Sequence, residues 1–163
     1  MRVFTLVEAL VVMAIVAILT ALAVPSFQEF VASRAVNTQI SDFSSSLRLA
    51  RTEAIKRGRP VVICRSNDTQ AVAPVCDAGA TWDSGWLILQ GNNLIRTQAR
   101  YRDSGGIVSQ AGLNSITFSA NGIAPAAAET TFTFQPPLPS AHASYTPLTK
   151  RICVSVTGVT RTC

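Results

Sequence analysis

The sequence predicts an α+β protein in which one long N-terminal helix packs against antiparallel β-sheet. Three observations point to this class. The chain opens with an apolar run, continues with apolar residues at helical spacing, and changes after Pro60 to short β-type runs separated by turn residues. With 163 residues the chain is expected to form about one domain, because domains typically hold ~100–200 residues.

The composition narrows the function classes. Hydrophobic residues make up 48% of the chain and charged residues 14%, against about 25% in ordinary soluble proteins. These fractions exclude a disordered polyelectrolyte and argue against an ordinary cytosolic globular protein. The 14 Lys and Arg outnumber the 9 Asp and Glu, so the formal net charge is +5.

The first element is an apolar helix over residues 4–24, whose single charged residue is Glu8. A helix of this length spans about 30 Å, the hydrocarbon thickness of a bilayer. Arg2 precedes the run, so the positive-inside rule leaves the N-terminus in the cytoplasm and the rest of the chain outside. A removed secretory signal is the alternative, since Ala21 and Ala23 provide small residues for cleavage. We expect a membrane-embedded half-helix.

Glu8 is the unusual residue of this run. A carboxylate inside a membrane segment costs a few kcal/mol and indicates a functional site. The alternative is that Glu8 lies near the helix end and reaches the lipid headgroups.

The helix continues over residues 25–58 as an amphipathic half, with a kink or local loosening expected at Pro25. Gly58 and Pro60 provide the signal that ends it. Arg48, Thr52 and Lys56 lie on its polar face. The apolar face recurs at spacings of four and three residues and consists of Val36, Ile40, Phe43, Leu47, Ala50 and Ala54.

A β-rich domain is expected over residues 59–163. Gly, Asn, Asp and Pro separate its short apolar runs, and a proline-rich loop covers residues 136–142. The expected strands are residues 61–65, 85–90, 95–102, 115–119, 130–135 and 151–156.

The four cysteines fit an oxidising compartment and allow three pairings. We favour Cys64–Cys76 and Cys153–Cys163, because each bridge closes a short loop between adjacent strands or turns. Two buried pairs of free cysteines are the alternative. No pair has the CxxC spacing and His142 is the single histidine, so we expect neither a metal nor a cofactor.

Catalysis has little support in the sequence. His142 has no nucleophile near it along the chain, and the acidic residues are scattered. Trp82 and Trp86 are expected in the core rather than in a binding site. We therefore expect a protein that is not an enzyme.

Basic residues are the remaining candidates for function. Residues 48–65 contain six Lys and Arg and one acid. In a strand over residues 95–102, Arg96, Arg100 and Arg102 would project from one face, and Lys150, Arg151 and Arg161 gather near the C-terminus. Such faces attract polyanions, including nucleic acid. Ordinary solvated charge, or contact with an anionic membrane surface, is the alternative.

The segment from Phe4 to Glu8, after a very short basic leader, resembles the class III signal of type IV pilins and type II secretion pseudopilins. The resemblance implies a leader at residues 1–3 and a prepilin peptidase that cuts between Val3 and Phe4 and methylates the new amine. It also implies that Glu8 neutralises the N-terminal amine of a neighbouring subunit during assembly. Most members of the family have Gly at the position of Val3.

Later segments resemble the GspH/FimT family, so that the resemblance covers nearly the whole chain. They are the segments 47–60, 61–66, 82–89, 116–122 and 151–158. The resemblance implies a type IV pilin fold and a minor pilin at the start or tip of a type IV pilus. A minor pseudopilin of type II secretion is the alternative. The resemblance further implies that other pilins are its partners. It also implies that the chain resides in the bacterial inner membrane, with a periplasmic C-terminal domain, before transfer to the pilus.

The FimT branch is similar to a minor pilin that binds double-stranded DNA in natural transformation. Its C-terminal tail carries a Gly-Arg-x-Arg motif. Gly158 and Arg161 match this motif, and Val159 replaces its first Arg. The resemblance therefore implies non-specific DNA contact through the tail of this chain.

Overall fold

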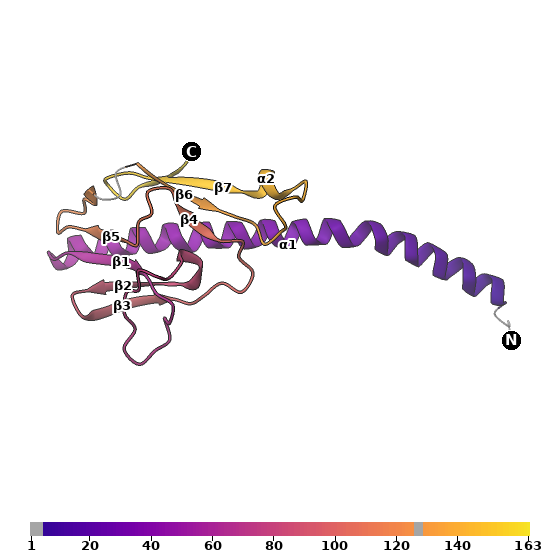
Figure 1. Ribbon diagram of the computed structural model, residues 1–163, viewed down its shortest axis with the longest axis horizontal. Coiled ribbons are helices and arrows are strands. Elements are labelled where there is room, and N and C mark those ends of the chain that lie inside the picture. The colour runs from indigo at the N-terminus through magenta and orange to yellow at the C-terminus, as the bar shows by residue number, and fades with distance from the viewer. Residues whose placement is uncertain (1–4, 126–128) are drawn as a thin grey trace.

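The computed structural model describes residues 5–125 and 129–163, and in residues 21–25 it describes the backbone without the side chains. One helix, α1 (Leu6–Arg57), forms the spine of the molecule, and two small sheets pack on its C-terminal half (Figure 1). The predicted leader and its cleavage site at Val3 and Phe4 lie outside the described residues.

Local chemistry sets both ends of α1. At its start, the Thr5 hydroxyl accepts a hydrogen bond from the Glu8 backbone N–H at 3.3 Å. At its end, Gly58 adopts φ +60°, and its N–H donates to the Ile55 carbonyl at 3.3 Å. The helix thus ends at Gly58, as the sequence predicts. The helix is continuous through residue 25, where a kink or local loosening was expected.

The N-terminal part of α1 protrudes from the domain and curves gently toward its start (Figure 1). Its large apolar side chains are exposed: Leu6 is 76% exposed, Met13 71% and Ile18 63%. The predicted membrane half, residues 4–24, lies partly outside the description. Within the described residues, α1 has no stretch that meets the length and hydropathy needed to cross a bilayer.

The C-terminal half of α1 is amphipathic as predicted. Along the predicted apolar face, Ile40 is half-buried and the other five residues are fully buried. Phe43 is central, because its ring contacts those of Trp82, Trp86, Phe132 and Phe134 at centroid distances of 4.7–5.8 Å. Both tryptophans are core residues, as the sequence predicts.

The strands form two antiparallel four-stranded sheets on α1 (Figure 1). The first has the order β3-β2-β1-β5 and the second β4-β6-β7-β8. The first sheet consists of β1 (Val61–Arg65), β2 (Trp86–Gln90), β3 (Asn93–Gln98) and β5 (Ser115–Phe118). The second consists of β4 (Ile107–Ser109), β6 (Thr130–Phe134), β7 (Lys150–Val154) and β8 (Thr160–Thr162).

Four short elements are absent from the sequence prediction. They are β4, β8, the 3-10 helix η1 (Trp82–Ser84) and helix α2 (Tyr145–Leu148), which hold three or four residues each. Periodicity over three residues cannot distinguish a strand from a loop. β8 exists because it pairs with β7, with Cys153 opposite Arg161.

The predicted strand over residues 95–102 is wrong at both ends. β3 starts at Asn93 and ends at Gln98, so Arg100 and Arg102 lie beyond it. The chain leaves the sheet because Tyr101 turns towards the core. Its ring packs on Trp86 at 5.9 Å, and its hydroxyl donates to the Asp42 carboxylate on α1 at 2.8 Å. Burial and this hydrogen bond raise the pKa of Tyr101 well above its ordinary value.

Candidate functional site

Two disulfides hold the loops around the sheets. Cys64 is bonded to Cys76, with the Cα atoms 5.5 Å apart, and Cys153 is bonded to Cys163, with the Cα atoms 5.8 Å apart. Both pairings are those predicted from the short loops that they close, so this prediction is confirmed. The second bridge joins β7 to the residue after β8 and therefore fixes the C-terminal segment to the sheet.

The outer face of β7 and β8 carries two arginines. Arg161 lies opposite Cys153 across the strand pair, so both side chains share one face of the sheet. Arg151 is two residues from Cys153 along β7 and lies on the same face. Both arginines are exposed. The structure thus places Arg151 and Arg161 as diagonal neighbours on a surface that a disulfide orders.

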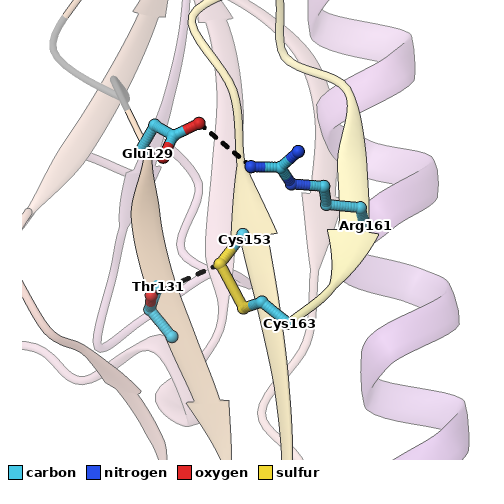
Figure 2. Close-up of a disulfide and its surroundings, with 5 residues drawn as sticks. All are labelled: Glu129, Thr131, Cys153, Arg161 and Cys163. Atoms are coloured by element: carbon cyan, nitrogen blue, oxygen red, sulfur yellow. Dashed lines mark hydrogen bonds and ion pairs between the residues drawn. A yellow bond between two sulfur atoms is a disulfide. The ribbon is translucent and has the colours of Figure 1, made fainter.

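Glu129 is the acidic neighbour of this face. Figure 2 shows Arg161 reaching across β7 to Glu129, above the Cys153–Cys163 bridge. The Arg161 Nη2 atom lies 3.0 Å from the Glu129 Oε1 atom. The two side chains are 64% and 75% exposed, so water screens the ion pair and it contributes little to stability. A polyanion could displace Glu129 at small cost.

Lys150 does not belong to this face, contrary to the expected cluster with Arg151 and Arg161. It precedes Arg151 in β7, and neighbouring strand residues point to opposite sides. Its Nζ atom donates to Asn37 Oδ1 on α1 at 2.7 Å. Lys150 therefore joins the second sheet to the helix.

Gly158 lies in the turn between β7 and β8, and packing explains why a glycine is there. Its φ is +68°, and a Cβ atom at this position would be 2.3 Å from Cε1 of Phe118. The turn therefore presses directly on the Phe118 ring at the end of β5. A side chain at position 158 would push the turn, and Arg161 with it, away from the core.

The other basic candidates remain apart. Arg96 is an exposed residue of β3, whereas Arg100 and Arg102 line a polar hollow with residues 67–70. The structure does not bring these three arginines onto one strand face, because β3 ends before Arg100. Arg48 and Arg51 of α1 lie beside the β7–β8 turn, which the sequence did not predict. The net charge of residues 48–65 was the signal that could have indicated them.

No metal centre is formed within the part of the chain that the structure describes. His142 is half-buried in the loop before α2, and its Nδ1 atom accepts a hydrogen bond from the Ser144 N–H at 3.1 Å.

Glu8 is exposed in the first turn of α1, and none of the described cations forms an ion pair with it. Its backbone N–H is capped by Thr5. The structure thus presents the carboxylate on the surface of the protruding part of the helix.

Comparison with known proteins identifies the family. The model of the family described as type II transport protein GspH matches residues 39–158. Two curated fimbrial proteins of Pseudomonas aeruginosa are each 38% identical over 68 residues, which is 41% of this chain and 44% of theirs. The chain therefore matches less than half the length of these relatives.

Solved structures give the same fold. Two crystal structures of the type IV minor pilin FimU from Pseudomonas aeruginosa superpose with TM-scores of 0.60 and 0.55, each at 18% identity. They cover 82% and 78% of this chain and 92% and 91% of their own. The shared fold is a long helix with antiparallel sheets on its C-terminal half. This chain therefore belongs to the GspH family and has the fold of a type IV minor pilin.

Proposed function

We propose that this protein is a structural, non-catalytic minor pilin that initiates or tips a type IV pilus. The observation that carries the proposal is that α1 protrudes beyond the sheets (Figure 1). The large apolar side chains of this part are exposed. Fully burying one such side chain is worth about 1.5–3 kcal/mol. An uncovered helix of this kind is therefore unfavourable in water. Neighbouring pilin helices in a filament, or the inner membrane before assembly, would cover it.

Glu8 has a defined part in this proposal. Packing against neighbouring helices would remove its carboxylate from water, and a buried charge is tolerable only when it is paired. The N-terminal amine of a neighbouring subunit, released when prepilin peptidase cuts between Val3 and Phe4, supplies that partner. Glu8 thus selects the axial position of one helix against the next.

The test compares Glu8→Ala with Glu53→Ala in the native host. Glu53 pairs with Arg57 on the domain side of α1 and serves as the matched carboxylate control. We expect Glu8→Ala protein to reach the membrane but to be depleted from sheared filaments, and the control to be incorporated. Mass spectrometry should find a chain that begins at N-methylated Phe4. A mature terminus near residue 24, or normal incorporation of Glu8→Ala, would contradict the proposal.

We further propose that the face of Arg151 and Arg161 contacts the phosphates of double-stranded DNA without sequence preference. Two exposed arginines on strands that a disulfide joins support this, because the backbone that carries them is already ordered before binding. Dissociation constants for non-specific binding lie near 10⁻⁴–10⁻⁶ M. The slope of log K against log salt concentration is about −0.9 for each phosphate that the protein neutralises. Many copies in one filament, or a long duplex, would raise the avidity.

Anisotropy of a labelled duplex with the full chain in neutral detergent tests this contact. Arg161→Gln should weaken binding equally for all sequences and reduce the salt slope by about one unit. Arg34→Gln is the control, since Arg34 lies over the Phe30 ring on α1 and is not part of this face. Equal binding by Arg161→Gln and the parent would refute the proposed face.

A minor pseudopilin of type II secretion is the second candidate, and the description of the matching family favours it. Deletion of the gene separates the two functions. Loss of pili and of DNA uptake with normal exoprotein secretion supports the pilin. The reverse pattern supports the pseudopilin.

A further inference from the structure

A groove separates α1 from the turn between β7 and β8. It has a volume of about 380 Å³. Arg48, Arg51 and Thr52 of the helix form one side, together with Ile55, and the segment from Gly158 to Thr160 forms the other. None of these lining residues is acidic. The groove therefore presents cationic groups without a competing carboxylate, whereas the Thr52 hydroxyl donates to the Arg48 carbonyl at 2.8 Å.

Arg48 and Arg51 are three residues apart and so lie on the same side of the helix. Neither guanidinium donates a hydrogen bond or forms an ion pair within the described part of the chain. The nearest acid along the helix, Glu53, is paired with Arg57 at 2.5 Å. The positive charge of the groove is therefore not neutralised by the protein itself.

Packing restricts where Arg51 can be. Its Nε atom is buried and has no hydrogen-bond partner. A Cβ atom on Gly122 would lie 3.1 Å from this Nε, so the Gly122 turn holds the side chain from behind. An arginine restrained in this way loses less conformational freedom when it binds an anion.

The opposite wall is also ordered. The Gly158 N–H donates to the Ser155 carbonyl at 2.8 Å, and the Val159 N–H donates to the Ser155 hydroxyl at 3.2 Å. Thr160 follows in β8 and lines the groove, whereas Arg161, the next residue, lies on the outer face. The edge strand β8 thus has cationic residues on both sides, Arg161 on one and the helix arginines on the other.

We propose that this groove seats a backbone phosphate of double-stranded DNA between Arg51, Arg48 and the β7–β8 turn. The inference rests on the proposed DNA contact at Arg161 and extends it to α1. Position 51 is 27 residues beyond position 24, which is about 40 Å along a helix with a rise of 1.5 Å per residue. That distance separates the groove from the predicted membrane half, so DNA rather than a lipid headgroup is the phosphate source.

The experiment measures binding of a labelled duplex to the full chain in neutral detergent over a series of salt concentrations. It compares Arg51→Gln, Arg48→Gln and Arg161→Gln with Arg34→Gln, a same-charge change on the same helix outside the groove. A fourfold rise in salt weakens binding about 3.5-fold for each neutralised phosphate. For Arg51→Gln, the weakening caused by this rise in salt should be about 3.5-fold smaller than for the parent, and for the control it should equal that of the parent.

A second measurement does not depend on variants. The Arg51 Nε–H resonance, followed by NMR during addition of unlabelled duplex, should shift at the concentration at which anisotropy rises. The proposed phosphate contact in the groove is refuted by the following result. The parent binds DNA and Arg161→Gln weakens binding, but Arg51→Gln binds as the parent does and the Arg51 resonance does not shift. If the parent shows no salt-sensitive DNA binding at all, the proposed DNA function itself is refuted, and the groove with it.

Discussion

Replacement of Gly158 by Ala tests how closely the β7–β8 turn packs on the core. Two costs are expected. The first is the strain of a non-glycine residue at φ +68°, about 1–2 kcal/mol. The second is overpacking, because the new Cβ would be 2.3 Å from the Phe118 ring; such insertions cost about 1–3 kcal/mol.

Gly112→Ala is the matched control. Gly112 has φ +64°, nearly the same backbone conformation, but a Cβ atom there would have nothing within 4 Å. The control therefore carries the strain without the contact. Gly158→Ala should be less stable than the control by about 1–3 kcal/mol, which lowers the melting temperature by a further ~2–12 °C in a protein of this size.

Tryptophan fluorescence is the suitable assay, since Trp82 and Trp86 are both buried in the domain core. In a Phe118→Leu background, the smaller side chain should remove most of the extra cost of Gly158→Ala. The reasoning is refuted if Gly158→Ala and Gly112→Ala destabilise equally. It is also refuted if Phe118→Leu leaves the difference between them unchanged.

Three further predictions concern the bridges, a buried tyrosine and the acidic neighbour of the basic face. Replacing both cysteines of either bridge by Ala should cost about 3 kcal/mol, because each closes a loop of 10 or 12 residues; urea unfolding measures it. The pKa of Tyr101 is raised by burial and by Asp42, so only the unfolded chain loses this proton above about pH 10. Stability should then fall by up to ~1.4 kcal/mol per pH unit in alkaline unfolding curves, and Tyr101→Phe should remove this part of the slope. Glu129→Gln frees Arg161 and should tighten DNA binding in the anisotropy assay; unchanged binding would mean that the ion pair does not compete.

Elements that depend on local interactions could be predicted from the sequence. α1 could be predicted because its apolar face repeats at helical spacing and Gly58 supplies its cap. β1 has the predicted bounds, Val61–Arg65, since a continuous β-branched run precedes turn residues. The bridges could be predicted because each joins cysteines that are close along the chain.

How distant segments meet depends on long-range packing, which the sequence pattern does not indicate. The division into two sheets and the pairing of β8 depend on partners that no local window contains. β3 ends at Gln98 because Tyr101 turns to pack on Trp86 and donate to Asp42 of α1, and Lys150 donates to Asn37 on the same helix. Arg48 and Arg51 lie beside the β7–β8 turn although about 110 residues separate them in sequence. The sequence shows which residues are basic, but long-range packing determines which of them share a surface.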